Sequence, residues 1–213
     1  VTRESTFTAA IRAKNLLKKV CVLNFASATQ PGGGVLNGRN AQEEVLSRQS
    51  TLYFSLKGQK PFYDYNKSHP DPFGTDYMIY SPNVLIIRDE KNFLIKPVKV
   101  SVISSVAVNN SELKKLYPNE DKSREVKRAM EKRCRRILEV CISEGNDVIV
   151  LGAFGCGAFY NDPVDVSQSF KKYLVDDEKR FYFESISFSI IGFNTKNIDA
   201  FAKTFELPII PKE

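Results

Sequence analysis

Three consecutive glycines, Gly32 to Gly34, are followed after seven residues by an amide and two carboxyl groups, Gln42, Glu43 and Glu44. Paired carboxyl groups can act as the general acid and base that cleave a glycosidic bond. Acidic residues in the first turn of a helix also offset the helix dipole favourably. Successive helical residues point about 100° apart, so the two carboxyls cannot share one role. The spacing leaves both interpretations open, a favourable helix start or an acid–base site.

A second glycine-rich segment, "GAFGCGAFYND" at 152–162, lies like "SATQPGGGVLNGRN" at 27–40 between an expected strand and an expected helix. Glycines let backbone N–H groups surround an anion, and a following helix adds its positive end. Neither segment matches the Rossmann or Walker spacing. Either loop alone is equally well explained as a structural turn. Two such loops at the carboxyl ends of strands would hold a diphosphate from both sides.

Other common site chemistries have few candidate residues. The single histidine, His69, lies in the Pro-, Asp- and Gly-rich stretch "YNKSHPDPFG", where a solvated loop histidine is expected rather than a triad member. The four cysteines form no C-x-x-C pair and there is only one histidine, so we expect neither a zinc site built from Cys and His nor a disulfide framework. We also expect no other metal and no cofactor. The four cysteines are Cys21, Cys134, Cys141 and Cys156. Free cysteines favour a reducing, cytoplasmic location, and no apolar run of about 18 residues predicts a membrane span.

The net charge of +6 and the isoelectric point of about 9.0 favour anionic partners such as phosphates, nucleotides or nucleic acid. The densest basic stretch is "KSREVKRAMEKRCRRILEV" at 122–140. Its apolar residues recur at helical spacing, at Val126, Ala129, Met130, Cys134, Ile137, Leu138 and Cys141. The basic residues fall mostly on the other face, which indicates either a solvated helix surface or a nucleic-acid patch.

Helical and strand patterns alternate along the chain, which predicts an α/β layered sheet in a single domain over residues 1–213. Helices are expected at 9–17, 41–56, 122–145, 164–174 and 197–205. Strands are expected at 20–26, 77–81, 84–90, 98–108, 147–154 and 183–191, with a long loop at 57–76. Asp162 followed by Pro163 is a strong helix start, because it combines an N-cap side chain with a proline at the first helical position.

The two glycine loops and the Gln-Glu-Glu set together resemble the signature of the poly(ADP-ribose) glycohydrolases. The segments "VLNFASATQPGGG", "NAQEEVLSRQSTLY", "YSPNV…RDE" and "LGAFGCGAFYNDP" are similar to the bacterial-type branch of that family, and the likeness runs to about residue 190. This resemblance implies a macrodomain-like three-layer sandwich, in which helices cover both faces of a mixed central sheet.

The resemblance also implies roles for individual residues. Glu44 would be the catalytic acid, Glu43 would bind ribose hydroxyls, and Gln42 would position the pair. The residues implied to bind ADP-ribose are Asn24, Ser27, Gly32, Gly33, Gly34, Gly155, Cys156, Gly157, Ala158, Phe159 and Phe193. Phe159 would pack against the distal ribose and Phe193 would stack on adenine, although a core aromatic is an equal alternative for Phe193.

The implied activity is hydrolysis of ribose–ribose bonds in poly(ADP-ribose) from the chain end, without a metal. The partner is then ADP-ribose, its polymer or an ADP-ribosylated macromolecule, and we expect a monomer. Two alternatives stay open, namely removal of a single ADP-ribose from protein or nucleic acid, and a non-catalytic ADP-ribose reader. The intact Gln42-Glu43-Glu44 set favours an enzyme, because a pure binder would not need it.

Overall fold

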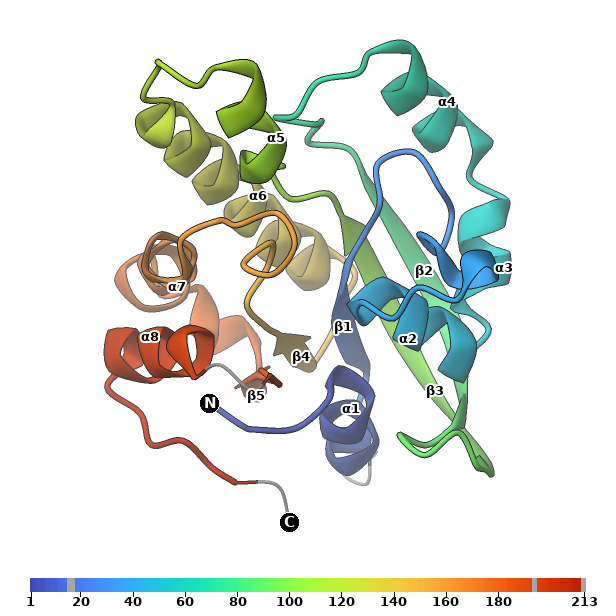
Figure 1. Ribbon diagram of the computed structural model, residues 1–213. Coiled ribbons are helices and arrows are strands. Elements are labelled where there is room, and N and C mark those ends of the chain that lie inside the picture. The colour runs from blue at the N-terminus through green and yellow to red at the C-terminus, as the bar shows by residue number, and fades with distance from the viewer. Residues whose placement is uncertain (15–17, 193–194, 212–213) are drawn as a thin grey trace.

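A five-stranded mixed sheet forms the centre of the computed structural model, which describes residues 1–14, 18–192 and 195–211 (Figure 1). The strands are β1 (Val20–Phe25), β2 (Met78–Arg88), β3 (Leu94–Ser105), β4 (Val148–Leu151) and β5 (Ser185–Phe188). Their order is β2-β3-β1-β4-β5. Only β2 is antiparallel to its neighbour, and the other pairs are parallel.

Helices cover both faces of this sheet, so the expected macrodomain-like three-layer architecture is confirmed (Figure 1). One layer holds α1 (Thr6–Lys14), α2 (Gln42–Gln49), α3 (Leu52–Lys57) and α4 (Lys60–Ser68). The other holds α5 (Asn110–Leu116), α6 (Ser123–Ser143), α7 (Pro163–Lys171) and α8 (Lys196–Phe205). Three short helical segments, Val35–Asn37, Lys172–Asp176 and Lys179–Tyr182, complete the described elements.

Alternation along the strands divides the core into two apolar clusters. In β1, Val20 and Val22 pack with α1 to α4, whereas Cys21 and Leu23 pack with α5 to α8. All four side chains are buried, because side chains of a strand point alternately to opposite faces and both faces are covered.

The two glycine loops leave the same edge of the sheet. β1 and β4 are parallel neighbours, in register from Val20 opposite Val148 to Val22 opposite Val150. Both strands therefore end at the carboxyl-terminal side of the sheet, and the loop that follows each strand begins there. The rings of Phe25 and Phe154 lie 5.7 Å apart where the two loops begin. The sheet thus brings together two segments that are more than a hundred residues apart in sequence.

The expected long loop at 57–76 is wrong in part, because α4 lies within it. Pro61 occupies the first turn of this helix, where a missing N–H costs nothing. Phe62, Tyr63 and Asn66 are buried on its inner face. Such a short apolar face between Gly58 and several polar residues does not give a clear helical period in the sequence.

Other boundaries differ in smaller ways. The expected helix at 41–56 divides into α2 and α3, because Ser50 is extended and pairs with Ile86 of β2. The two strands expected at 77–81 and 84–90 are one continuous β2 with a bulge at Asn83, whose φ is +60°. The short helix α5 was not expected.

The basic helix is α6, and the helix ends just before Gly145, which has the positive φ that a helix terminator needs. Several of its cations are paired within the chain: Lys127 with Asp165, and both Lys132 and Arg133 with Asp76. These pairs favour the solvated-surface interpretation over a nucleic-acid patch. Among the helices in the described ranges, none is long and apolar enough to cross a membrane.

Candidate active site

Gln42 fastens the start of α2 to the end of β1. Its side-chain Oε1 accepts the N–H of Phe25 at 2.8 Å, and its Nε2 donates to the carbonyl of Leu23 at 2.8 Å. The Nε2 also contacts the hydroxyl of Thr6, on α1, at 3.2 Å. The Gln42 amide thus hydrogen-bonds to the backbone at the end of β1 as a neighbouring strand would. This contact positions the two carboxyl groups that follow it.

Glu43 is buried at the end of β1, with 4% of its surface exposed. Its Oε2 accepts the N–H of Ser27 at 2.7 Å, and its Oε1 lies 3.4 Å from Nδ2 of Asn24. Burial raises the pKa of Glu43 to about 8, against the opposing effect of these donors. The carboxyl therefore keeps its proton at neutral pH in the free protein.

Glu44 points into the first glycine loop and is also buried, with 6% of its surface exposed. Its Oε1 accepts the N–H of Gly34 at 2.8 Å, and its Oε2 accepts the N–H of Ala41, at the helix N-cap, at 3.0 Å. The second contact, from the N–H of the N-cap residue to the side chain of the N3 residue, is one of the two hydrogen bonds of a capping box. Each oxygen is thus oriented by one backbone donor.

The glycine loop closes around these carboxyl groups because it lacks side chains. Gly32 and Gly33 have φ values of +69° and +59°, which glycine adopts readily. A Cβ atom on Gly33 would lie 2.4 Å from Oε1 of Glu44 and 3.1 Å from Oε2 of Glu43. The two carboxyl groups therefore meet at this glycine, each held by its own set of donors.

The second glycine loop is fixed by Asn161, which is 3% exposed. Its Nδ2 donates to the carbonyls of Val108 at 2.8 Å and Gly155 at 3.0 Å. Gly155 has a φ of +72°, and a Cβ there would lie 2.5 Å from the Cβ of Ala107. The loop is therefore packed closely against the segment that follows β3.

The remaining residues of this loop differ in exposure. Gly157 and Ala158 are exposed, and a Cβ on Gly157 would meet no atom within 4 Å, so this part of the backbone is accessible. Phe159 is half-buried, and its carbonyl accepts the N–H of Ser111 on α5. Burial, with a smaller contribution from Asp162, raises the pKa of the Cys156 thiol to about 12. A thiol that stays protonated is a poor nucleophile.

Asn24 and Ser27 both support Glu43 in this structure. Asn24 is fully buried and also donates to Oγ of Ser104 at 3.0 Å, whereas Ser27 contributes its backbone N–H. The amide oxygen of Asn24 has no hydrogen-bond partner among the described residues. Phe193, the expected adenine contact, lies outside the described residues.

Sequence reasoning assigned no role to four residues that the structure places around the site, namely Thr6, Tyr63, Ser104 and Asn161. Tyr63 is 2% exposed. Burial and the charge of Glu43 raise the pKa of Tyr63. Thr6, Tyr63 and Ser104 lie in segments whose local sequence does not indicate a site residue. Asn161 lies in the second glycine-rich segment, which could have indicated its role.

Comparison with known proteins identifies relatives of this chain. The family model "Microbial-type PARG, catalytic domain" matches residues 1–89, which include the first loop and the carboxyl pair. None of the curated proteins matches the chain.

Two solved structures extend the similarity over nearly the whole chain. Poly(ADP-ribose) glycohydrolase from Deinococcus radiodurans, in complex with ADP-ribose, is 37% identical, with a TM-score of 0.90 over 97% of this chain and 83% of that one. The enzyme from Thermomonospora curvata, bound to the inhibitor ADP-HPD, is 35% identical, with a TM-score of 0.88 over 95% and 78%. The chain therefore belongs to the bacterial-type poly(ADP-ribose) glycohydrolase family.

Proposed function

We propose that this protein hydrolyses the ribose–ribose O-glycosidic bonds of poly(ADP-ribose) from the chain end and releases ADP-ribose. The observation that carries the proposal is the meeting of Glu43 and Glu44 at Gly33, within a loop that has the backbone freedom to approach a ligand. A protein that only binds ADP-ribose would not need two buried carboxyl groups at this point.

The two glycine loops would hold the diphosphate of the terminal unit. Both leave the same edge of the sheet, and both present backbone N–H groups that can bind an anion. The exposed backbone around Gly157 is the accessible part of the second loop. Phe159 would then pack against the distal ribose, next to the carboxyl pair.

Glu44 would protonate the departing ribose oxygen as the bond to the anomeric carbon breaks. The sugar then has oxocarbenium-like character, and the same group, now ionised, would take a proton from the attacking water. Glu43 would form hydrogen bonds with the ribose hydroxyls. Because burial raises the pKa of Glu43 to about 8, Glu43 is protonated at neutral pH in the free protein and can donate a hydrogen bond to a ribose hydroxyl.

The test is a Glu44→Gln variant, which keeps the shape of the side chain but cannot transfer the proton. We expect hydrolysis of poly(ADP-ribose) to fall by a factor on the order of 10² or more, while ADP-ribose affinity stays within a few-fold. Glu125→Gln, the same change in the exposed first turn of α6, is the matched control and should keep full activity.

Substrate preference is measured with the same preparations. Wild-type protein is incubated with poly(ADP-ribose) and with mono-ADP-ribosylated protein and nucleic acid. Release of ADP-ribose from the polymer supports the proposal. Release from the mono-modified targets alone, or binding without any release, would replace it with one of the two alternatives.

A further inference from the structure

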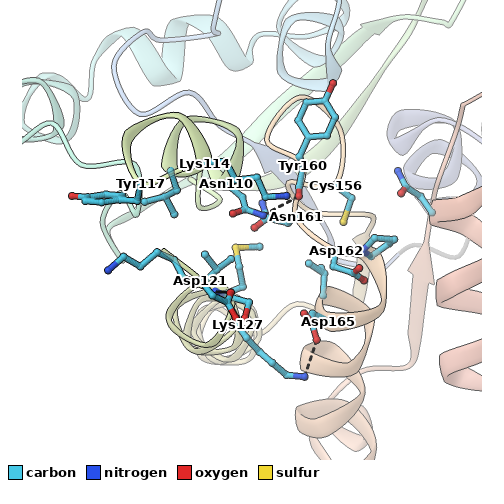
Figure 2. Close-up of a pocket in the computed structure, with 18 of the residues that line it drawn as sticks. Asn110, Lys114, Tyr117, Asp121, Lys127, Cys156, Tyr160, Asn161, Asp162 and Asp165 are labelled. Atoms are coloured by element: carbon cyan, nitrogen blue, oxygen red, sulfur yellow. Dashed lines mark hydrogen bonds and ion pairs between the residues drawn. The ribbon is translucent and has the colours of Figure 1, made fainter. Parts of the chain in front are cut away.

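A pocket of about 780 Å³ lies behind the second glycine loop, between α5, α6 and α7 (Figure 2). Its volume is within the range of sites that bind nucleotide-sized ligands. Cys156, Tyr160 and Asn161 of the loop line it, so the same loop forms part of this pocket and of the proposed active site. The mechanism proposed above does not use this pocket.

The pocket combines an apolar floor with a polar rim. Buried residues on three helices form the floor, and they are Leu113, Val126, Met130 and Val166. The rim carries Lys114 and the exposed aromatic ring of Tyr117, from α5 and its C-cap. An apolar floor beside an aromatic ring suits a nucleobase, because bases bind by stacking and apolar contact.

Most charges around the pocket are satisfied within the chain. Lys127 pairs with Asp165 at 2.7 Å, and Lys122 pairs with Glu120 at 2.6 Å. Asp121 and Asp162 accept backbone N–H groups at the starts of α6 and α7. The carboxylates of Asp121, Asp162 and Asp165, which are labelled in Figure 2, are therefore already engaged within the chain.

Lys114, by contrast, has no ion-pair partner among the described residues and is exposed. It lies at the same end of the pocket as Asn110, Asn161 and Tyr160 (Figure 2). This end is where an anionic group would find an uncompensated positive charge.

Hydrogen bonds between α5 and the second glycine loop connect this end of the pocket to the proposed active site. The N–H of Ser111 donates to the carbonyl of Phe159, and Nδ2 of Asn110 donates to the carbonyl of Tyr160 at 3.2 Å. The first turn of α5 is thus bonded to the residues that would flank the distal ribose. Tyr160 has a φ of +55°, and its side chain points away from the pocket in Figure 2.

We propose that this pocket binds the ADP-ribose unit on the leaving side of the scissile bond, with its diphosphate at Lys114 and its adenine over the apolar floor. This inference rests on the proposed function. The leaving oxygen belongs to the adenosine of that unit, so its base and diphosphate would extend from the scissile bond beside Phe159 toward the adjacent residues Tyr160 and Asn161, which line the pocket. The pocket begins there and has the size and chemistry of one nucleoside diphosphate.

The test compares Lys114→Glu with Lys115→Glu, the neighbouring residue, which pairs with Glu112 and does not line the pocket. Both variants change the net charge equally on the same short helix. Each is assayed on poly(ADP-ribose) and on an aryl glycoside of ADP-ribose, which lacks a second unit. We expect Lys114→Glu to lower kcat/KM for the polymer about tenfold and to change kcat/KM for the aryl glycoside less than twofold. Lys115→Glu should change neither by more than twofold.

Equal effects of the two variants on the polymer, or an equal loss on both substrates in Lys114→Glu, would overturn the proposal. Binding measurements separate its failure from that of the proposed function. If the wild-type protein hydrolyses neither substrate, the activity is wrong, but the pocket can still be tested with a dimer of ADP-ribose. The dimer should bind about tenfold more tightly than ADP-ribose, and Lys114→Glu should abolish that difference. Equal affinity of the wild-type protein for dimer and monomer refutes the second binding site.

Discussion

The carboxylate of Glu44 occupies the space that a side chain at position 33 would need. Its Oε1 lies 2.4 Å from the position of a Cβ on Gly33, and the same oxygen accepts the N–H of Gly34 at 2.8 Å. The glycines before the carboxyl pair thus serve two purposes. They allow the positive φ of the loop, and they let its backbone contact the carboxylate directly.

Gly33→Ala should therefore displace Glu44 and reduce catalysis. The new methyl group would clash with the carboxylate and would also carry a backbone strain of about 1–2 kcal/mol at a φ of +59°. We expect kcat on poly(ADP-ribose) to fall by a factor on the order of 100, since a small misplacement of a reacting group has such an effect. Steady-state kinetics and the midpoint of thermal unfolding measure the two consequences.

Gly38→Ala is the matched control for that variant. Gly38 has a φ of +73°, but a Cβ there would meet no atom within 4 Å. The two variants share the backbone strain and differ in the clash. A comparable loss of kcat in Gly38→Ala would mean that loop strain, rather than contact with Glu44, controls the activity.

Glu43 should make the protein less stable as the pH rises. An unfolded glutamate ionises near pH 4.5, whereas Glu43 in the folded protein keeps its proton to about pH 8. Between these values unfolding releases a proton, so the free energy of unfolding falls with increasing pH. Glu43→Gln removes this dependence and should stabilise the protein relative to wild type at pH 8.5, by at most about 5 kcal/mol.

Chemical denaturation of the wild-type and Glu43→Gln proteins at pH 4, 6 and 8.5 measures that difference. The gain should be smallest at pH 4, where both states of the wild-type protein are protonated, and largest at pH 8.5. Glu125→Gln should show no such trend, because its carboxyl is exposed. A difference between wild type and Glu43→Gln that does not vary with pH would contradict the raised pKa.

Cys156→Ala should retain hydrolysis. Burial raises the pKa of this thiol to about 12, so it is not a thiolate at neutral pH, despite its place in the phosphate loop. We expect kcat to change by less than about threefold, and we expect iodoacetamide to leave the wild-type rate unchanged. A hundredfold loss in Cys156→Ala, with normal ADP-ribose binding, would instead indicate covalent catalysis.

The parts of the fold that sequence reasoning located have strong local patterns. The apolar run of β1 is buried on both faces, and the side chain of Asp162 accepts the N–H of Val164 at 2.7 Å, as the helix-start pattern predicted. These features depend on neighbouring residues in the chain. The family resemblance supplied the roles of the carboxyl pair, which spacing alone had left open.

The missed parts depend on contacts between distant residues. The break between α2 and α3 follows from pairing of Ser50 with Ile86, and the burial of Tyr63 follows from the packing of α4 near Glu43. Burial also raises the pKa of Glu43, so this carboxyl is protonated at neutral pH. Burial is a property of the folded protein, so no pattern of residue types reveals it.

Asn161→Ala should weaken ADP-ribose binding as well as stability. The variant removes two hydrogen bonds, to the carbonyls of Val108 and Gly155; the buried carbonyl of Val108 loses this donor, whereas the carbonyl of Gly155 keeps the backbone N–H of residue 161, at 3.1 Å. We expect a loss of about 1–3 kcal/mol in the free energy of unfolding. Since Gly155 begins the phosphate loop, ADP-ribose affinity should also fall, by roughly tenfold, as measured by titration calorimetry at a temperature where the variant is folded.

Asn146→Ala is the control for this loss. Asn146 is equally buried, and its Nδ2 also donates to a backbone carbonyl, that of Cys141, at 3.0 Å. It lies before β4, at the opposite end of that strand from the phosphate loop. The two variants should lose similar stability, but Asn146→Ala should keep the wild-type affinity for ADP-ribose. If both lose affinity equally, general destabilisation explains the effect; if Asn161→Ala alone loses it, the asparagine orders the loop that receives the diphosphate.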